Sequence, residues 1–477
     1  MNKQAITIAG AGLAGSEAAL QLANRGYSVT LYDMKPRTRS AAHHSNQFAE
    51  IVCSNSFGSQ NSVDDAGNPS VTASGLLKEE MQALGCQLLA IAQSVSVPAG
   101  KALAVDREAF SQKVTDALLT HPLITLVPDP LTVIPSDGIT LIATGPLTTP
   151  ALAETISNHL GQDQLYFFDA ASPIIATQSI DTNIAFKQDR YQLEKSPNKP
   201  TANTPESPES SEAADGHYIN CPLDKDEYQQ FYTRLQQAER APLKAFEKES
   251  NPKTKTPYFE SCLPVEVIAS RGVDTLRFGP MKPVGLIDPK TGKRPYAVVQ
   301  LRQDNAEGTL YNMVGFQTNL KWGEQKALIQ SIPGLQHAEI VRYGVMHRNT
   351  YIDSPTVLLP TLQHKSTPTL FFAGQLTGTE GYTESIATGL LAAINIDNLI
   401  QERTLTVLPK TTMLGALLQY ITRAEAANKN FQPINSNWGI LKPLSADDTM
   451  LKTFRKNKKL RNQHYVERAL TAIQAYC

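Results

Sequence analysis

The chain has 477 residues, a formal net charge of -1 at pH 7 and a hydrophobic fraction of 41%. A single core rarely grows past about 250–300 residues, so we expect at least two domains. The sequence has no apolar run near the ~20 residues of a membrane helix and no leader-like start, which favours a cytoplasmic protein. The five cysteines form no CxxC pair, so neither a zinc site nor a disulfide framework is indicated.

The N-terminal segment predicts the start of a dinucleotide-binding fold. Ala5–Ala9 is typical of a short buried strand, Ser16–Arg25 of a helix and Tyr27–Tyr32 of a second strand. The intervening GAGLAG at 10–15 allows a tight turn, a close approach to a pyrophosphate and close helix packing. Asp33 ends the second strand, where a carboxylate binds ribose hydroxyls. The expected contacts are Gly10, Ala11, Gly12, Leu13, Ala14, Gly15 and Asp33.

Two later segments favour FAD over NAD. The predicted strand Ile139–Ala143 runs into a Thr-Gly pair that resembles the ATG motif of two-dinucleotide flavoproteins. The predicted strand Leu370–Ala373, a glycine-rich turn and a helix from about 385 to 400 resemble their second FAD motif. Glu380 and Glu384 are expected to be acids at the helix start. The expected flavin contacts in these segments are Thr144, Gly145, Gly374, Gln375, Gly381, Thr388 and Gly389.

The middle of the chain has a different texture. Strand-like runs such as Thr275–Phe278 and Tyr296–Leu301 are separated by proline and glycine. We therefore expect an α/β protein in which a Rossmann-like FAD-binding domain carries an inserted α+β domain. The expected divisions are 1–160 and 331–430 for the FAD-binding domain, 161–330 for the inserted domain with a mobile loop at 196–216, and 431–477 for a basic C-terminal helical tail.

The tail segment Lys452–Arg468 carries seven Lys or Arg residues against one acid, Glu467. Such a run suits contact with phosphates, as in a nucleic acid. It equally suits a solvated helix face, and charge alone does not separate the two interpretations.

Several segments together identify a resemblance to a known family. They include HHSNQFAEIVCSNSF around Cys53, ESCLPVEVIASRG around Cys262, RFGPMKPVGLIDPKTGK, and FAGQLTGTEGYTESIATG. The chain resembles the folate- and FAD-dependent tRNA uracil-54 5-methyltransferases (TrmFO), which belong to the wider group of GidA-related flavoproteins. The resemblance covers nearly the whole chain, and the stretch at 196–216 is the main departure.

This resemblance implies formation of 5-methyluridine at position 54 in the T-arm of tRNA. It also implies FAD as cofactor, methylenetetrahydrofolate as one-carbon donor, and NADPH or NADH as reductant. We expect no membrane association and no obligatory protein partner. Three alternatives stay open: a GidA-like enzyme for wobble uridines, the same methylation on ribosomal RNA, and an RNA-binding factor in which the flavin is structural.

Two cysteines fall on the functional cysteines of the family. Carbon 5 of uracil is a poor nucleophile, and attack on carbon 6 by a thiolate activates it. We assign Cys262 as this nucleophile and Cys53 to the carbon 5 proton or the flavin adduct, although the two roles are interchangeable at this stage. Cys86, Cys221 and Cys477 are expected to be small buried residues.

Further substrate contacts are predicted from cations and aromatic residues in the family segments. Cations suit phosphates or the folate glutamate tail, and aromatic rings suit stacking on a pterin or a base. These candidates are Lys282, Arg302, Lys321, Trp322, Tyr343, His347 and Arg348.

Overall fold

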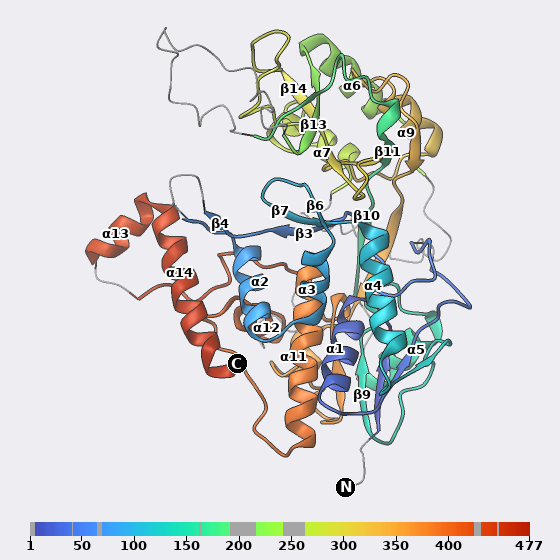
Figure 1. The fold of residues 1–477 in the computed structure, drawn as a ribbon, viewed down its shortest axis with the longest axis vertical. Coiled ribbons are helices and arrows are strands. Elements are labelled where there is room, and N and C mark those ends of the chain that lie inside the picture. The colour runs from blue at the N-terminus through green and yellow to red at the C-terminus, as the bar shows by residue number, and fades with distance from the viewer. Residues whose placement is uncertain are drawn as a thin grey trace, which may run out of the picture.

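The computed structural model describes residues 5–40, 42–63, 69–161, 165–190, 216–241, 263–423, 431–445 and 448–477. For 165–169, 347–348, 448, 451 and 455 it describes the backbone alone. The chain forms a larger lower unit, which contains both termini, and a smaller upper unit (Figure 1). The predicted mobile loop at 196–216 lies outside the described residues, apart from Gly216.

The lower unit is organised around a five-stranded parallel sheet. Its strand order is β18 (Leu370–Phe372), β9 (Ile139–Ile142), β1 (Ile6–Ala9), β2 (Val29–Tyr32) and β8 (Ile124–Val127). Ile6 pairs with Val29 on one side and with Ile139 on the other, so β1 is the central strand. The chain moves outward from β1 in both directions, and the carboxyl end of β1 is therefore the point where a ligand binds in such sheets.

Both faces of this sheet are covered, as parallel sheets require. Alternate strand residues such as Ile6 and Ile8 share one core with α1 (Leu13–Asn24), α4 (Arg107–Thr120) and α11 (Tyr382–Ile400). Ala9, Ile142 and Phe372 point the other way and share a second core with α5 (Pro150–Leu160). The predicted α/β fold is confirmed.

The upper unit contains a six-stranded antiparallel sheet. Its order is β12 (Phe186–Lys187), β13 (Tyr218–Leu223), β14 (Ala297–Gln303), β15 (Leu310–Met313), β11 (Ile174–Ala176) and β16 (Ile340–Arg342). The helices α6 (Lys225–Gln237), α7 (Val265–Ser270) and α9 (Trp322–Ile329) share its hydrophobic core. Strand β16 lies past residue 330, which was the predicted end of the inserted domain.

A separate two-stranded ribbon connects the two units. In it, β10 (Leu165–Ala170) runs antiparallel to β17 (Met346–Tyr351), with Ala170 opposite Met346. The chain thus enters and leaves the upper unit at the same place, between the two larger sheets (Figure 1).

Three predicted elements differ from the structure in type or by three residues at their start, and the predicted strands differ by one or two residues at their ends. Thr275–Phe278 is helix α8, not a strand, because the Thr275 hydroxyl donates to the carbonyls of Ile268 and Gly272 and folds the segment back on α7. Helices α1 and α11 each begin three residues earlier than predicted, at Leu13 and Tyr382. Gly15 therefore belongs to the first helix rather than to the turn.

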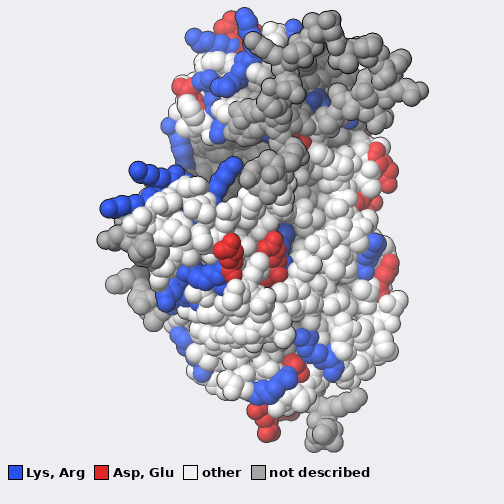
Figure 2. Space-filling model, turned by 60° about the vertical axis from the view of Figure 1, so that its left-hand side comes forward, with Lys and Arg blue, Asp and Glu red and all other residues white. Residues whose placement is uncertain are grey.

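The predicted C-terminal tail forms helices α13 (Asp448–Lys456) and α14 (Lys458–Ile473). Tyr465, Val466 and Ile473 are buried on the side of α14 that faces α2 (Ala73–Ala83). Figure 2 brings this side of the molecule forward and shows Lys and Arg side chains standing out from it. Within the described residues, no helix is long and apolar enough to cross a membrane.

Candidate functional site

The turn after β1 is built to receive an anion. Gly10 has a φ of 97°, which favours glycine, and a Cβ there would lie 2.6 Å from the Ala143 carbonyl oxygen. Gly12 begins α1 without a side-chain cap, and α1 has no acid in its first turn. A Cβ on Gly12 would meet nothing within 4 Å. The positive end of α1 is therefore open to a pyrophosphate.

Two buried glycines explain how close the surrounding helices come. A Cβ on Gly15 would lie 1.9 Å from the Gly10 carbonyl oxygen, so α1 packs directly on the turn. A Cβ on Gly389 would lie 2.2 Å from the Ala14 carbonyl oxygen, so α11 packs directly on α1. This contact places the two predicted FAD motifs side by side.

The carboxylate of Asp33 lies where a ribose is expected. It is 9% exposed and accepts hydrogen bonds from the backbone N–H of Ala11 at 2.7 Å and of Lys35 at 2.9 Å. Asp33, Gly10, Gly12 and Thr144 line one narrow cavity of about 80 Å³. Buried Lys35 lines it as well, and burial lowers the pKa of its amine. Lys35 was missed by the sequence reasoning, although it follows the acid by only two residues.

The second FAD segment is ordered by its own polar side chains. Gly374 donates its N–H to the Thr388 hydroxyl at 2.7 Å, and that hydroxyl donates to the Ser385 carbonyl. The Gln375 amide donates to the Glu380 carboxylate. Gly381, with a φ of 116°, is the N-cap residue directly before α11. In this segment the predicted residues therefore hold the turn and the helix start in place.

The acids of this segment lie at the helix start, as expected. Glu384 is in the first turn of α11, and its carboxylate accepts the N–H and the hydroxyl of Ser436 at 2.9 and 2.6 Å. After the neighbouring strand β9, Thr144 precedes the short turn at 145–147 and Gly145 begins it, and a Cβ on Gly145 would meet nothing within 4 Å. The open turns, the uncapped helix and the terminal acid fit FAD.

Cys53 lies where the second FAD segment, the connecting ribbon and the 51–55 loop meet. Its N–H donates to the hydroxyl of Tyr382, the first residue of α11, at 2.8 Å. Its Sγ lies 3.7 Å from the carbonyl oxygen of Ala170, the last residue of β10. The thiol is partly exposed. The Tyr382 contact was not predictable, because the two residues are 329 positions apart.

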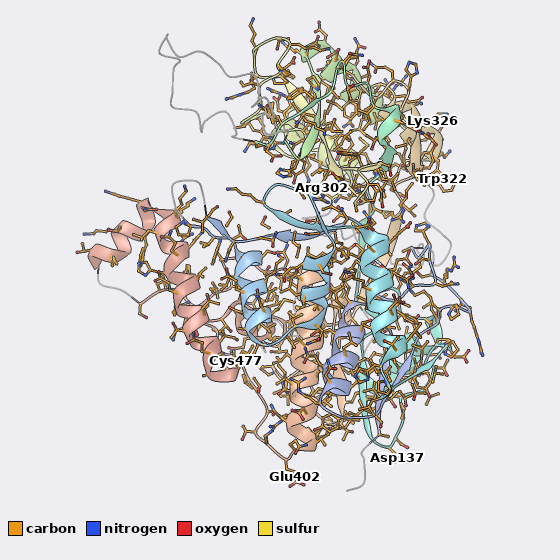
Figure 3. All side chains as sticks on the ribbon, viewed as in Figure 1. Asp137, Arg302, Trp322, Lys326, Glu402 and Cys477 are labelled. Carbon is orange, nitrogen blue, oxygen red and sulfur yellow. The ribbon has the colours of Figure 1, made fainter. Side chains whose placement is uncertain are left out.

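A buried ion pair holds this loop against the upper unit. The Arg107 Nε donates to both Asp304 oxygens at 3.0 and 2.9 Å, while its Nη1 and Nη2 donate to the carbonyls of Ile51 and Cys53. Arg302, one of the predicted substrate contacts, is 7% exposed and donates to the Asn55 side chain. It lies where the two units meet (Figure 3).

A larger cavity of about 760 Å³ opens beside this ion pair. Its lining comes from both units and includes Ile51, Arg107 and Asp304 together with Trp322 and Tyr343. The two aromatic rings are nearly parallel, with centroids 5.4 Å apart. The structure thus brings two of the predicted stacking residues together, close to the Cys53 loop.

The other predicted contacts lie elsewhere. Lys282 and Lys321 do not line this cavity, and the exposed Lys321 amine pairs with Glu239. His347 and Arg348 belong to β17, and the structure describes only their backbone. Cys262, the predicted nucleophile, lies outside the described residues.

The remaining cysteines differ from one another. Cys86 and Cys221 are buried as expected, and burial raises the pKa of Cys86 well above its usual value and that of Cys221 to about 12. Neither is therefore a reactive thiol. Cys477 is exposed at the end of the chain, so the expectation that it is buried was wrong.

Comparisons with known proteins agree with this geometry. Residues 5–404 match the family described as glucose inhibited division protein A. The methylenetetrahydrofolate--tRNA-(uracil-5-)-methyltransferase TrmFO of Halalkalibacterium halodurans is 52% identical over 476 residues, covering 100% of this chain and 99% of the relative. The protein of the same name from Listeria monocytogenes is 51% identical over 472 residues, with 99% and 98% covered.

Solved structures show the same fold. A crystal structure of Aquifex aeolicus GidA matches 99% of this chain and 76% of its own chain, with a TM-score of 0.65 and 16% identity. Sequence identity to the TrmFO relatives over the full length assigns the chain to a family more narrowly than the shared fold does. The chain belongs to the TrmFO family, within the wider glucose inhibited division protein A group.

Proposed function

We propose that the protein methylates carbon 5 of uridine 54 in the T-loop of tRNA. Methylenetetrahydrofolate donates the carbon, FAD is the cofactor, and NADPH or NADH is the reductant. The position of Cys53 carries this proposal. Its backbone is held by Tyr382 at the start of the FAD-binding helix α11 and by Arg107, which lines the large cavity. A partly exposed thiol beside a flavin segment, and near a space large enough for a substrate, supports the proposal.

The residues that would hold FAD are those of the two glycine segments. Gly12 and the start of α1 would hold the pyrophosphate, Asp33 would hold the ribose, and Thr144, Gly374 and Gln375 would hold the rest of the cofactor. When bound, FAD carries the one-carbon unit and supplies the reducing electrons, which NADPH or NADH restores.

The two cysteines divide the work on the uracil. In the proposed sequence, the Cys262 thiolate adds to carbon 6, and the new S–C6 bond makes carbon 5 enolate-like. Carbon 5 would then bond to the one-carbon unit. Cys53 would take the carbon 5 proton, and the electron pair left on carbon 5 would break the bond between the one-carbon unit and its carrier nitrogen, giving an exocyclic methylene. Delivery of a hydride completes the methyl group, and the S–C6 bond breaks to release the thiolate.

Helices α13 and α14 offer a surface for the RNA. Lys452, Lys456, Lys458 and Lys459 are exposed there, and the apolar side of α14 is buried. Such a fixed row of cations suits the phosphates of a tRNA arm. We propose this role for the tail in preference to a merely solvated face, because the side that carries it shows a gathering of Lys and Arg (Figure 2). The protein would act in the cytoplasm without an obligatory protein partner.

The test is an assay with purified protein, methylenetetrahydrofolate, NADPH and an unmodified tRNA transcript, read by mass spectrometry of digested nucleosides. We expect 5-methyluridine in the T-loop, also in a T-arm minihelix that has no anticodon. Modification confined to the wobble position would support a GidA-like activity instead. Methylation of ribosomal RNA alone would show that ribosomal RNA, and not tRNA, is the substrate.

Cysteine variants test the assignment of roles. Cys262→Ala should retain FAD and lose methylation by at least about 1000-fold, since no other thiolate attacks carbon 6. Cys53→Ala should retain the covalent RNA adduct but not release the product. The exposed Cys477→Ala is the matched control and should behave as the parent protein. Full activity of Cys262→Ala would refute its role, and loss of the adduct only in Cys53→Ala would exchange the two roles.

A further inference from the structure

The large cavity is lined by an aromatic pair, one ring of which is largely exposed. Trp322 is the first residue of α9, and its side chain is 64% exposed in spite of its size. It stacks on Tyr343 with an angle of 16° between the rings. Figure 3 shows Trp322 at the outer side of the upper unit, on the same helix as Lys326. A large ring fixed by one neighbour and open on its other side suits stacking on a planar ligand.

The residue before Tyr343 supplies a cation without a complete set of partners. Arg342 ends β16 and lines the same cavity. Its Nη1 is buried and has no hydrogen-bond partner among the residues that the structure describes. Burial lowers the pKa of this guanidinium, and the nearby charge of Arg107 lowers it further. A buried donor without a partner is costly, so this position favours an anionic ligand.

The two carboxylates whose charges act on the Arg342 guanidinium, Asp304 and Glu50, already have other partners. Asp304 accepts two hydrogen bonds from Arg107. Glu50 accepts the N–H of His44 at 2.7 Å and lies 3.8 Å from the Lys35 amine. Neither carboxylate accepts a hydrogen bond from the Arg342 Nη1. That donor is therefore available to a molecule that enters the cavity.

We propose that this cavity binds a nucleotide of the RNA next to the methylated base, with Arg342 on its phosphate and Trp322 on its base. The inference rests on the proposed function and adds a second RNA subsite to it. A folate also combines a planar ring with an anionic group, its glutamate tail. We favour RNA because Trp322 is largely exposed, so a strand can continue past it beyond the cavity.

The test is the affinity for a T-arm minihelix, measured by fluorescence anisotropy on the FAD-loaded protein. Arg342→Gln should weaken RNA binding roughly tenfold and reduce the salt dependence by about one phosphate contact. Arg342→Lys, which keeps the charge, should recover most of this loss. Trp322→Ala should weaken binding roughly five- to tenfold, and Trp322→Phe much less. Lys326→Gln is the matched control, since it removes an exposed cation one turn along the same helix.

Neutral methylphosphonate linkages identify the phosphate. One substitution beside the target uridine should weaken binding to the parent protein but not to Arg342→Gln. The inference fails if no linkage behaves in this way, or if Arg342→Gln weakens binding of the folate donor and leaves the RNA affinity unchanged. It also fails if Lys326→Gln has the same effect. Absence of methylation by the parent protein, with intact RNA binding, would refute the proposed function and not this subsite.

Discussion

Three helices of the lower unit differ in whether a carboxylate of the protein accepts hydrogen bonds from the N–H groups at the helix start. Helix α3 (Gln87–Ser94) receives the carboxylate of Glu17, which accepts the N–H groups of Gln87 and Leu88 at 3.0 and 2.8 Å. Helix α12 (Met413–Ile421) receives Glu80, which accepts those of Met413 and Leu414 at 2.6 and 2.8 Å. Helix α1 has neither a side-chain cap nor an acid in its first turn.

The difference separates a structural use of a helix start from a binding use. Glu17 and Glu80 are both buried, and burial raises the pKa of Glu17 and raises that of Glu80 to about 7. The protein thus accepts the desolvation of a buried carboxyl group to supply an internal hydrogen-bond acceptor at α3 and α12. At α1 a diphosphate ligand would supply the anion, and the helix start is left open for it.

The largest effect is expected from giving α1 its own anion. Gly12→Asp has space for the new side chain, and aspartate is a favoured cap, so the apoprotein should keep its stability. Two negative charges about 4 Å apart repel by several kcal/mol near a protein surface, so FAD should bind roughly 100-fold more weakly. Fluorescence titration of the apoprotein with FAD measures this. Gly12→Asn is the neutral control, and equal affinities of the two variants would contradict the comparison.

A smaller effect is expected where α11 supports α1. In Gly389→Ala the new methyl group meets the Ala14 carbonyl oxygen, so the helices must separate. We expect the free energy of unfolding to fall by about 1–3 kcal/mol, with weaker FAD binding. Thermal denaturation with and without FAD measures both. Gly323→Ala, where a Cβ has open space in α9, is the control and should change stability by less than about 0.5 kcal/mol. Similar losses in both variants would show that helix proximity is not the cause.

The smallest effect concerns pH and the cap of α12. Between the usual glutamate pKa and about 7, folded Glu80 holds a proton that the unfolded chain lacks. Stability from this group is therefore lost as pH rises through that window, by at most about 1.4 kcal/mol per pH unit. Urea titrations from pH 5 to 8 should show this slope in the parent protein relative to Glu80→Gln. Parallel stability curves for the two proteins would mean that Glu80 does not titrate there.

The sequence predicted what local pattern encodes. Local patterns predict the buried strands, the GAGLAG turn and the second glycine segment, because each occupies a short stretch of sequence. The alternation of apolar residues and the spacing of glycines are enough to identify them. Charge spacing likewise marked the tail that forms α13 and α14. Thr275–Phe278 misled because its side chains suit a strand, whereas the Thr275 hydroxyl contacts that fold it back are visible only in three dimensions.

Long-range partners were not predictable. Arg107 and Asp304 are 197 positions apart, and Glu80 and Met413 are 333 apart. Each of these side chains is an ordinary charged residue in the sequence, and only the fold gives it a partner. The predicted roles of Cys53, Cys262 and the FAD contacts stay predictions, because they came from family resemblance and motif position. The numerical domain boundaries stay predictions too.

The β10–β17 ribbon has a consequence for how such a protein is assembled from parts. Because Ala170 pairs with Met346, the two ends of the upper unit are neighbours. A unit attached by adjacent ends is inserted, exchanged or lost without rerouting its host. The five-stranded parallel sheet includes β18, which follows the upper unit in the sequence. This sheet is therefore continuous in space although its strands are divided in the sequence. One flavin scaffold can therefore acquire different substrate-facing modules at a single point of attachment.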